Sequence, residues 1–548
     1  MNILVIGGVA AGTKTAAKLK RDNREYNVTL ITKGKDISYA GCGLPYYVGG
    51  VIEDKDSLIV NTPENFSKLT EVDVITDTEA ISVDRENKVV IAKNLLTKKD
   101  VKFKYDKLVL ATGADPIKPS IEGIDLEGVY YMRTPKDAID LREVIEGKEI
   151  KRAIVVGGGF IGLEVAENLH ECNIKTTIID AAEHILPGFD NEVCSYIEDE
   201  LMESGIMVLT NETLSSIEGN DKVSKIRTDK RAMKADLVVM AVGIKANVEL
   251  ARDCGLELEN NKTIKVNEYM QTSDNNIYAA GDCVAVKHIL SDKKVWSPMG
   301  SSANKEGRCL AQTLAGKNSE FKGVLGTAIV KLLNINVART GLTEKEAINL
   351  GYDVESVIVP IDDKAHYYPG VDLIFIKLIA DRNTEKVLGA QIFGKGIVDK
   401  QIDVVATAMT FDAKVSDLQN LDLAYAPPFS TAIPPIGHAA NVLLNKINGE
   451  VDTITYDEFI KDKDLYKIID SGKVQKLEAA QFINLTNING KIDGLEYDDK
   501  ILLVCARGKR AYMTYNRMKY YGYKDVKVLE GGIALNKDLL NLELVGGN

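Results

Sequence analysis

Apolar residues along this chain gather in short runs that alternate with amphipathic stretches, which is the pattern of α/β domains. The first run, 2–6, is rich in β-branched residues and leads into a helix-like stretch, 13–20, and a second strand, 28–31. The same order returns further along, with an apolar run at 153–156, a helical stretch and another strand at 176–179. We therefore expect two copies of a βαβ unit.

The first unit has a glycine-rich turn between its strand and its helix. The turn runs from Gly7 to Gly12, and such a turn lets the backbone approach a pyrophosphate that rests against a helix N-terminus. Val9 replaces the usual middle glycine, and Thr32 stands where an acid that binds ribose would be expected. These departures weaken the local pattern without abolishing it.

The second unit matches the dinucleotide fingerprint in full, with Gly157, Gly159 and Gly162 in its turn. Its second strand ends at Asp180, whose carboxylate could accept hydrogen bonds from a ribose, although a solvated acid at a strand end is the alternative. No arginine follows directly, which favours NADH over NADPH. Two turns in strand-to-helix context predict two bound dinucleotides.

Further segments fit between and after these units. Gly113 and Gly243 each close a short apolar run and look like crossovers between the two nucleotide modules. Gly281 and Asp282 end another short strand, which could place a carboxylate beside a ribityl chain or could be an ordinary strand-to-turn junction. The alternation of strands and helices changes character near residue 323 and again near residue 453.

Composition narrows the function classes. The formal charge of −12 gives no support for a nucleic-acid-binding surface, and no apolar run approaches the roughly 18–20 residues of a membrane span. The N-terminus lacks the features of a secretory signal, so we expect a cytoplasmic protein. The seven cysteines are scattered and form no CxxC pair, so neither a disulfide framework nor a zinc site is expected.

Six segments together resemble the flavoprotein disulfide reductases that bind two dinucleotides, and within them the coenzyme A-disulfide reductases fused to a rhodanese domain. The segments are the turns 7–12 and 157–162, the stretch 38–47 around Cys42, Gly281-Asp282, His366 to Gly370, and Tyr425 to Pro428. The resemblance implies an α/β protein with two Rossmann-like domains, one for FAD (1–115 and 244–322) and one for NADH (116–243). It further implies an α+β dimerisation domain (323–448), a C-terminal α/β rhodanese domain (453–548) and a homodimer whose active sites draw on both subunits.

The same resemblance implies the residues that contact the cofactors. They are Gly7, Gly12, Thr32, Ser38, Gly113, Gly281, Asp282, Gly157, Gly159, Gly162, Asp180 and Gly243.

Cys42 is the candidate redox residue. Gly41 and Gly43 flank it, so a flexible loop could bring the thiol to a planar ring, and a helix that begins afterwards would favour the thiolate. A buried turn cysteine is the alternative. Residue 47 is Tyr, so the CxxxxC spacing of the glutathione-reductase-like enzymes is absent, and one cysteine must form a mixed disulfide with a small thiol.

The resemblance implies that Cys42 cycles between a thiol and a mixed disulfide with coenzyme A, while electrons pass from NADH through FAD. It also implies that Tyr367 and Tyr425, the latter supplied by the partner subunit, assist the departing thiolate. Packing is the alternative role for these tyrosines. Coenzyme A carries phosphates, which could bind Lys14, Lys18 and Arg21 on one helix face, together with Asn304 and Arg308, unless these form only a solvated polar surface.

A second reactive cysteine is expected near the C-terminus. Cys505 follows the apolar run 501–504 and begins the sequence Cys-Ala-Arg-Gly-Lys-Arg, which resembles a rhodanese active-site loop. Backbone N–H groups, Arg507, Lys509 and Arg510 could stabilise a thiolate or persulfide. A cysteine that precedes a helix by chance is the alternative. The usual Asp-x-Arg of an early rhodanese strand reads Asn-Leu-Thr at 484–486, so the domain could instead serve delivery or docking.

These features predict an enzyme that reduces a small-molecule disulfide or persulfide, such as coenzyme A disulfide, coenzyme A persulfide, polysulfide or elemental sulfur. The first alternative is an NADH oxidase or peroxidase that works through a cysteine sulfenic acid. Such relatives typically carry a histidine in the first glycine turn, and this turn has none. The second alternative is a redox-sensing or sulfur-relay protein.

Overall fold

The computed structural model describes residues 1–147 and 150–541. The chain divides into two compact units. The first comprises Met1–Pro187 and Ile197–Val324, and the second comprises Gly188–Tyr196 and Leu325–Asn548. Among the described residues, no helix combines the length and the apolar character that crossing a membrane requires.

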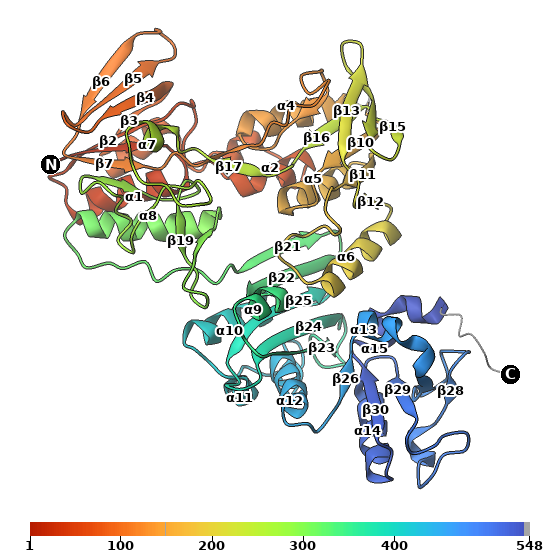
Figure 1. Cartoon of the computed structure of the whole chain (residues 1–548). Coiled ribbons are helices and arrows are strands. Elements are labelled where there is room, and N and C mark those ends of the chain that lie inside the picture. Colours follow the sequence, from red (N-terminus) through yellow and green to blue (C-terminus); the bar gives the residue numbers. More distant parts are fainter. Residues whose placement is uncertain (148–149, 542–548) are drawn as a thin grey trace. The chain divides into compact units, whose positions relative to one another are not determined.

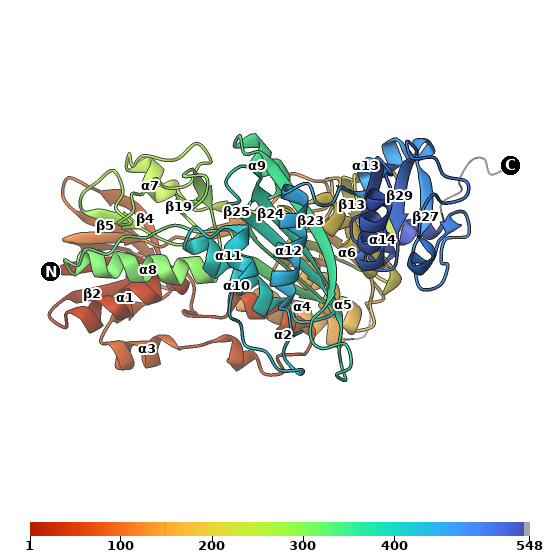
Figure 2. The same ribbon diagram turned by 90° about the horizontal axis from the view of Figure 1, so that it is seen from below.

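The N-terminal sheet of the first unit has the strand order β18-β7-β1-β2-β3, with every pair parallel. Its strands are β1 (Asn2–Ile6), β2 (Asn27–Ile31), β3 (Asp73–Ile75), β7 (Lys107–Leu110) and β18 (Ile277–Ala279). Helices α1 (Ala10–Asp22) and α8 (Gly300–Leu314) lie side by side along it (Figures 1 and 2). Burial on both faces explains why these strands are continuous apolar runs.

The second sheet of this unit repeats the plan, with the order β12-β11-β10-β16-β9 and only parallel pairs. Its strands are β9 (Val129–Tyr130), β10 (Arg152–Val156), β11 (Lys175–Ile179), β12 (Met207–Leu209) and β16 (Leu237–Met240), and its helices include α4 (Pro135–Glu146) and α5 (Phe160–Glu171). The chain enters and leaves this part through β8 (Ala114–Pro116) and β17 (Ile244–Ala246), which pair with each other.

Smaller elements complete the first unit. Two antiparallel sheets contain β4 (Thr78–Asp84), β5 (Val89–Asn94) and β6 (Asp100–Lys104), and β13 (Leu214–Gly219), β14 (Val223–Thr228) and β15 (Ala232–Lys234). The remaining pieces are η1 (Gly41–Gly43), α2 (Leu44–Val48), η2 (Lys55–Leu58), α3 (Pro63–Thr70), α7 (Glu249–Asp253), β19 (Ala285–Lys287) and β20 (Lys294–Trp296).

The second unit is built on an antiparallel sheet with the order β21-β22-β25-β24-β23, which leaves β23 at an edge. Its strands are β21 (Ala328–Leu332), β22 (Ile335–Gly341), β23 (Val354–Asp362), β24 (Leu373–Asp381) and β25 (Val387–Gly394). Helices α10 (Asp399–Thr410) and α12 (Pro435–Ile447) pack on it, as Figure 2 shows. Helix α9 (Glu344–Asn349) lies between β22 and β23, and α11 (Val415–Gln419) lies between α10 and α12.

The segment Gly188–Tyr196, which includes the start of α6 (Asn191–Glu203), also packs on this sheet. The ring of Tyr196 lies 5.0 Å from Phe375 and 5.2 Å from Phe393 between centroids. By its contacts, this segment belongs to the second compact unit.

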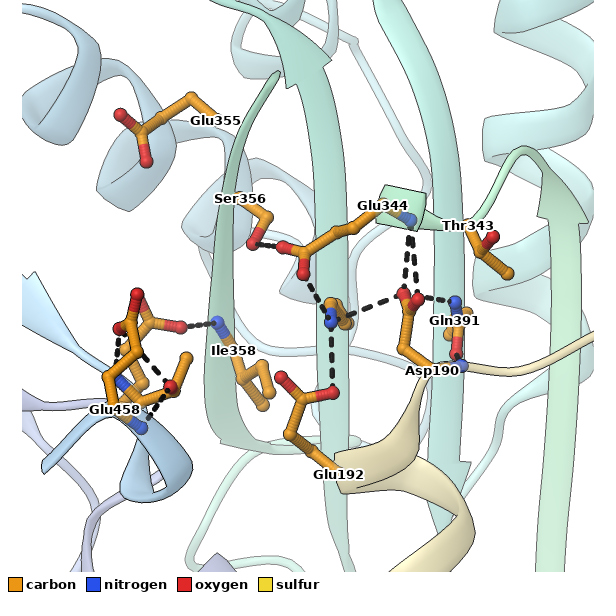
Figure 3. A network of polar contacts seen from close by, with 12 residues as sticks. Asp190, Glu192, Thr343, Glu344, Glu355, Ser356, Ile358, Gln391 and Glu458 are labelled. Atoms are coloured by element: carbon orange, nitrogen blue, oxygen red, sulfur yellow. Dashed lines mark hydrogen bonds and ion pairs between the residues drawn. The ribbon is translucent and has the colours of Figure 1, made fainter. Parts of the chain in front are cut away.

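A buried charge cluster secures that segment. The ammonium of Lys377, on β24, is 1% exposed and lies 3.2 Å from Asp190, 3.1 Å from Glu192 and 3.2 Å from Glu344. Figure 3 shows the three carboxylates converging on one nitrogen, with Gln391 also bonded to Asp190. Burial raises the pKa of Asp190 and of Glu192, despite the opposing effect of the Lys377 charge. One cation therefore pairs with three carboxylates from two separate segments of the chain.

The C-terminal part of the second unit has a parallel sheet with the order β26-β30-β29-β27-β28. Its elements are β26 (Thr453–Ile454), α13 (Tyr456–Lys461), η3 (Lys463–Leu465), β27 (Lys467–Asp470), β28 (Gln481–Phe482), η4 (Leu485–Asn487), β29 (Lys500–Val504), α14 (Lys509–Tyr520), β30 (Asp525–Leu529), α15 (Gly532–Leu535) and η5 (Lys537–Asn541). Alternate residues of β29 enter different cores: Ile501 and Leu503 pack with α14, and Leu502 and Val504 pack with α13 and α15.

Candidate active site

Both glycine turns have the same geometry. Gly7 adopts φ +113°, and a Cβ there would lie 2.0 Å from the carbonyl oxygen of Ala111. A Cβ on Gly12 would lie 1.9 Å from the carbonyl oxygen of Gly7. Gly157 and Gly162 meet the same constraints against Ala241 and Gly157. The outer glycines of each turn are therefore required by the close approach of backbone to backbone.

The middle glycine of the second turn, Gly159, is not required by contacts with the backbone. A Cβ on Gly159 would meet nothing within 4 Å, and the residue has φ −77°, which any amino acid adopts. The space in front of Gly159 is a cradle that a Cβ would begin to fill, at the N-terminus of α5, where a pyrophosphate is favoured. The corresponding residue of the first turn, Val9, has φ −106°, a backbone conformation that residues other than glycine adopt without strain.

The carboxyl ends of three neighbouring strands, β1, β7 and β18, carry the predicted flavin-binding residues. Gly281 packs directly on the first helix, because a Cβ there would lie 2.9 Å from the Cβ of Ala11. Its N–H donates to the buried carboxylate of Glu306 at 2.7 Å. Ligands of doubly wound sheets bind in the crevice at this edge. The residues present therefore fit a dinucleotide.

Arg133 joins two of these strand ends, and sequence reasoning missed it. Its guanidinium lies 3.7 Å from the carboxylate of Asp282 and would lie 3.2 Å from a Cβ on Gly113. Burial raises the pKa of Asp282, and Arg133 opposes that shift. Arg133 directly precedes a helix cap, which gives no sequence signal for such a role.

Ser38 and Thr32 lie beside the first glycine turn. The N–H of Ser38 donates to the carbonyl oxygen of Gly8 at 2.8 Å, and a Cβ on Gly8 would lie 3.2 Å from Thr32. Ser38 has φ +49°, a left-handed conformation that turns the chain toward the cysteine loop. The structure brings both predicted residues to the turn.

Asp180 bonds the turn of its own nucleotide module. One carboxylate oxygen accepts from the N–H of Gly158 at 2.6 Å, and the other accepts from the N–H of Ala182 at 2.8 Å. Each oxygen keeps a lone pair for a ribose hydroxyl. Gly243 has φ +104°, and its carbonyl oxygen accepts from the N–H of Ile117 at the crossover.

Cys42 lies in η1 and is an exposed free thiol. We expected the following helix to favour its thiolate, but the structure acts in the opposite direction. Desolvation by the surrounding protein raises the pKa of the Cys42 thiol, and the carboxylates of Glu164 and Asp282 raise it further. Helix α2 has only five residues, so its dipole is small beside two nearby negative charges.

Tyr46 and Glu164 form a second pair that the sequence did not reveal. The Tyr46 hydroxyl donates to Glu164 Oε1 at 3.2 Å, between α2 and α5. Burial raises the pKa of Glu164 to about 7, although the bond from Tyr46 opposes the shift. Burial and Glu164 likewise raise the pKa of Tyr46. Glu164 comes two residues after Gly162, and it reaches Tyr46 only because α2 packs on α5.

The predicted phosphate-binding residues lie on two adjacent helices. Lys14 on α1 approaches Gly307 of α8, and Asn304 and Arg308 are exposed on that second helix. Asn304 also donates to the carbonyl oxygen of its own helix at Gly300. Lys18 forms an ion pair with Asp22, so part of its charge is already neutralised, and Arg21 is exposed.

Tyr367 and Tyr425 lie together within one chain. Both side chains are well exposed, and a hydrogen bond with Tyr367 raises the pKa of Tyr425. We expected Tyr425 alone to come from the partner subunit. The two phenols interact within one chain, and the assignment of Tyr425 to the partner subunit stays a prediction.

Cys505 is 3% exposed, because it continues the alternation of β29 on the side that faces α14. Its sulfur accepts from the N–H of Ala511 in the first turn of that helix, at 3.4 Å. The loop turns through Gly508, which has φ +81°. This is the predicted strand-to-helix position, with a helix N-terminus directed at the sulfur.

The two loop arginines have separate partners. Arg510 donates to the carbonyl oxygen of Ser471 at 2.9 Å and to the side chain of Asn484 at 3.4 Å. Asn484 therefore replaces the expected aspartate as a neutral partner. Arg507 instead forms an ion pair with Asp362 at the end of β23, at 2.6 Å.

Glu530 joins the C-terminal sheet to the same edge strand. Its carboxylate accepts from the N–H of Ile358 at 3.1 Å and from Lys446 at 2.9 Å, and it is 4% exposed. The next residue, Gly531, donates its N–H to the carbonyl oxygen of Ile358 at 3.2 Å. Gly532 packs so closely on the active loop that a Cβ would lie 2.6 Å from the Cys505 carbonyl oxygen.

Two dinucleotide cradles in one unit and the exposed thiol of Cys42 define a class of protein. It is an oxidoreductase in which electrons pass from a pyridine nucleotide toward sulfur. Residues 1–305 match the model of the pyridine nucleotide-disulphide oxidoreductase family, residues 327–435 match its dimerisation domain, and residues 447–536 match the rhodanese-like domain.

Individual proteins agree with these matches. An NAD(P)H sulfur oxidoreductase (CoA-dependent) of Pyrococcus abyssi is 38% identical over 442 residues, which is 80% of this chain and 98% of the relative. An NADH oxidase of Methanocaldococcus jannaschii is 35% identical over 451 residues, which is 82% of this chain and all of the relative. The structure of an NAD-dependent persulfide reductase from A. fulgidus superposes with a TM-score of 0.93 at 38% identity, over 98% of this chain and all of that one.

This chain belongs to the pyridine nucleotide-disulphide oxidoreductase family and carries a rhodanese-like domain at its C-terminal end. Its cofactors are FAD and a pyridine nucleotide. The predicted fold class and the predicted class of enzyme are thereby confirmed.

Proposed function

We propose that this enzyme uses NADH to reduce a sulfur–sulfur bond in coenzyme A disulfide, coenzyme A persulfide or polysulfide. Cys42 is the single redox cysteine and forms a mixed disulfide with coenzyme A. The observation that carries the proposal is Cys42 itself, an exposed free thiol that is close enough to Asp282 to respond to its charge. The names of the similar reductases supply the substrate class.

The cofactor sites follow from the two cradles. FAD would lie along Gly7, Gly12, Thr32, Ser38, Gly113, Gly281 and Asp282, and NADH along Gly157, Gly159, Gly162, Asp180 and Gly243. The corresponding domains are 1–115 with 244–322 for FAD, 116–243 for NADH, 323–448 for dimerisation and 453–548 for the rhodanese-like part. When bound, the flavin supplies the transfer of two electrons from the nicotinamide to sulfur.

Other residues of the chain would bind the substrate or assist its reaction. Lys14, Lys18, Arg21, Asn304 and Arg308 bind the phosphates of coenzyme A. Tyr367 and Tyr425 meet the departing thiol in a homodimer. Cys505 accepts or presents sulfane sulfur, and Arg510, which is fixed beside its loop, stabilises the anion. The helix N-terminus directed at Cys505 supports this role for the second cysteine.

The proposal is tested by anaerobic NADH oxidation with each of the three substrates. We expect Cys42→Ser to abolish turnover with all of them and Cys505→Ser to impair only some. Near-normal rates in the Cys42→Ser enzyme would exclude the mechanism.

An NADH oxidase is the second candidate, and the relative of that name together with the exposure of Cys42 favours considering it. In that reaction oxygen would replace the disulfide, and the cysteine would become a sulfenic acid. NADH oxidation that requires oxygen and does not respond to coenzyme A persulfide would support this candidate. If the protein is a sulfur relay, NADH oxidation should be negligible with either oxygen or coenzyme A persulfide.

A further inference from the structure

The loop that follows Cys505 carries three cations, and a carboxylate from outside the loop neutralises one of them. The cations are Arg507, Lys509 and Arg510. Arg507 Nη1 donates to Asp362 Oδ1 at 2.6 Å. Arg510 keeps its charge, because both of its partners are neutral oxygens, and Lys509 is exposed and forms no ion pair with the residues that the structure describes. Together with Asp362, the loop therefore has two net positive charges instead of three.

Asp362 supplies that negative charge from a different sheet. It is the last residue of β23, which lies at the edge of the antiparallel sheet. The adjacent acid, Asp363, is 1% exposed and accepts instead from the N–H groups of Asp372 at 3.0 Å and Ile397 at 3.2 Å. Of these two neighbouring acids, Asp362 is thus the one directed at the Cys505 loop.

The backbone of this loop is fixed close to the sulfur. The carbonyl oxygen of Cys505 accepts from the N–H of Ile533 at 3.1 Å, and that of Ala506 accepts from the N–H of Ala534 at 3.0 Å. Two peptide steps of about 3.8 Å separate the Cα atoms of Cys505 and Arg507, which therefore lie within about 7.6 Å of each other. A charge at residue 507 consequently acts on any anion that approaches Cys505.

We propose that Asp362 determines which sulfur donors Cys505 accepts. Because Asp362 cancels the charge of Arg507, it weakens the attraction of the loop for dianions such as thiosulfate more than for donors with one negative charge or none. The donor class that remains favoured is the thiol persulfide, whose reacting end carries at most one negative charge. The inference rests on the proposed role of Cys505 and names its substrate class.

The transfer step balances for either kind of donor. The Cys505 thiolate attacks the outer, sulfane sulfur, a new S–S bond forms, and the original bond of the donor breaks. With a persulfide the step is Cys505–S⁻ + RSSH → Cys505–SS⁻ + RSH. With thiosulfate it is Cys505–S⁻ + SSO₃²⁻ → Cys505–SS⁻ + SO₃²⁻. Neither step needs an external oxidant or reductant, because the sulfane sulfur passes at its own oxidation level.

The first test compares two alkylating reagents that differ by one charge. Iodoacetate is a monoanion and iodoacetamide is neutral, and mass spectrometry of the peptide that contains Cys505 gives the rate of each in the holoenzyme. At about 7 Å in water, one unit charge changes the approach of a monoanion by a factor of about three. The ratio of the two rates isolates this effect, because opening of the loop admits both reagents alike.

Opposite results are expected for the two members of the ion pair. Asp362→Asn leaves the Arg507 cation uncompensated, so the ratio of the iodoacetate rate to the iodoacetamide rate should rise about threefold. Arg507→Met leaves the Asp362 carboxylate uncompensated, so the ratio should fall about threefold. If the ion pair served only to hold the loop closed, both substitutions would speed both reagents and leave the ratio unchanged. That result would overturn the proposal.

Two controls accompany these variants. Asp498→Asn removes the partner of Lys524 before the start of β29, whereas Cys505 follows the end of that strand, so this variant should keep the wild-type ratio. In about 1 M salt the Debye length is about 3 Å, so the differences between the variants should disappear. Asp362→Ser also removes the charge and replaces Asp362→Asn if that variant does not fold. An equal change of the ratio in Asp498→Asn would exclude a specific role for Asp362.

The second test measures sulfur donors directly. Thiosulfate is a dianion and methanethiosulfonate a monoanion, and each yields thiocyanate when cyanide accepts the sulfur from Cys505. In Asp362→Asn, kcat/KM should rise about sevenfold for thiosulfate and about threefold for methanethiosulfonate. An unchanged preference between the two donors, with thiocyanate still formed, would remove only this inference. If neither donor gave thiocyanate, the role of Cys505 in the proposed function would be lost as well.

Discussion

Arg507 Nη1 lies 2.6 Å from Asp362 Oδ1, which links the loop that follows Cys505 to the last residue of strand β23. The same strand is bonded through Ile358 to Glu530 and Gly531, and the next residue, Gly532, packs on that loop. The Cys505 loop is therefore held at two points along one edge of the antiparallel sheet.

This double attachment predicts that Arg507 limits the opening of the Cys505 loop. Arg507→Met should cost less than about 1 kcal/mol of stability, because the ion pair is partly exposed. It should nevertheless raise the rate at which Cys505 is alkylated several-fold, since local opening governs a buried thiol. Lys473→Met, an exposed change in the same domain, is the control. An unchanged alkylation rate in Arg507→Met would mean that the pair does not restrain the loop.

Alanine substitutions at Gly157 and Gly159 should affect different properties, stability at the first and NADH affinity at the second. Gly157→Ala forces a Cβ to 2.3 Å from a backbone oxygen at φ +110°, so it should destabilise the protein by about 3 kcal/mol. Gly159→Ala has open space, so it should fold normally yet bind NADH about tenfold more weakly, a loss of about 1.4 kcal/mol. Thermal unfolding and NADH titration distinguish the two. Normal NADH affinity in folded Gly159→Ala would remove this residue from the cofactor site.

Lys377 should be critical for stability. Lys377→Met leaves three carboxylates without their cation and should cost about 3–5 kcal/mol at pH 7. The exposed change Lys345→Met should cost little. Denaturant titration measures both, and a loss below about 1 kcal/mol would show that the cluster relaxes without its cation.

The deficit of Lys377→Met should also depend on pH. Burial already raises the folded-state pKa of Asp190 and Glu192, and removal of Lys377 should raise each further. A carboxyl whose folded pKa is raised contributes stability below its unfolded pKa and loses it as the pH rises. The variant should therefore approach the wild type below about pH 4 and diverge above it. A deficit that is constant between pH 4 and pH 7 would contradict this reasoning.

The tyrosine pair should be visible by spectroscopy. The hydrogen bond with Tyr367 raises the pKa of Tyr425, so Tyr367→Phe should return that pKa toward its ordinary value near 10. NMR of ζ-carbon-labelled tyrosine follows the phenol, with Tyr425→Phe to assign the signal. Tyr520→Phe, at an exposed and distant position in sequence, should change nothing. If the Tyr425 signal titrates identically in Tyr367→Phe, the two phenols do not interact.

Local patterns in the sequence predicted the parts of the site that depend on local backbone geometry. Gly7, Gly12, Gly157 and Gly162 were found because a tight strand-to-helix turn leaves no space for a Cβ. Cys505 was found for a related reason, since its strand and helix are adjacent in the sequence.

Roles set by packing between distant segments could not be predicted in this way. Glu164 acts on Cys42 only because α5 packs on α2, and Arg133 reaches Asp282 across the fold. The expectation of a favoured thiolate at Cys42 failed for the same reason, because the opposing carboxylates are far away in the sequence. The partner of Arg507 was equally hidden, since Asp362 lies in another domain.

The bonding of Ile358 has a practical consequence for anyone who shortens this protein. A truncated protein that ends after α12 would expose the unpaired backbone groups at the edge of β23. It would also remove Glu530, one of the carboxylates that pair with Lys446. Exposed edge strands of this kind pair with other chains and promote aggregation. The C-terminal domain thus covers the edge strand of its neighbour, and its removal should lower solubility whatever its effect on catalysis.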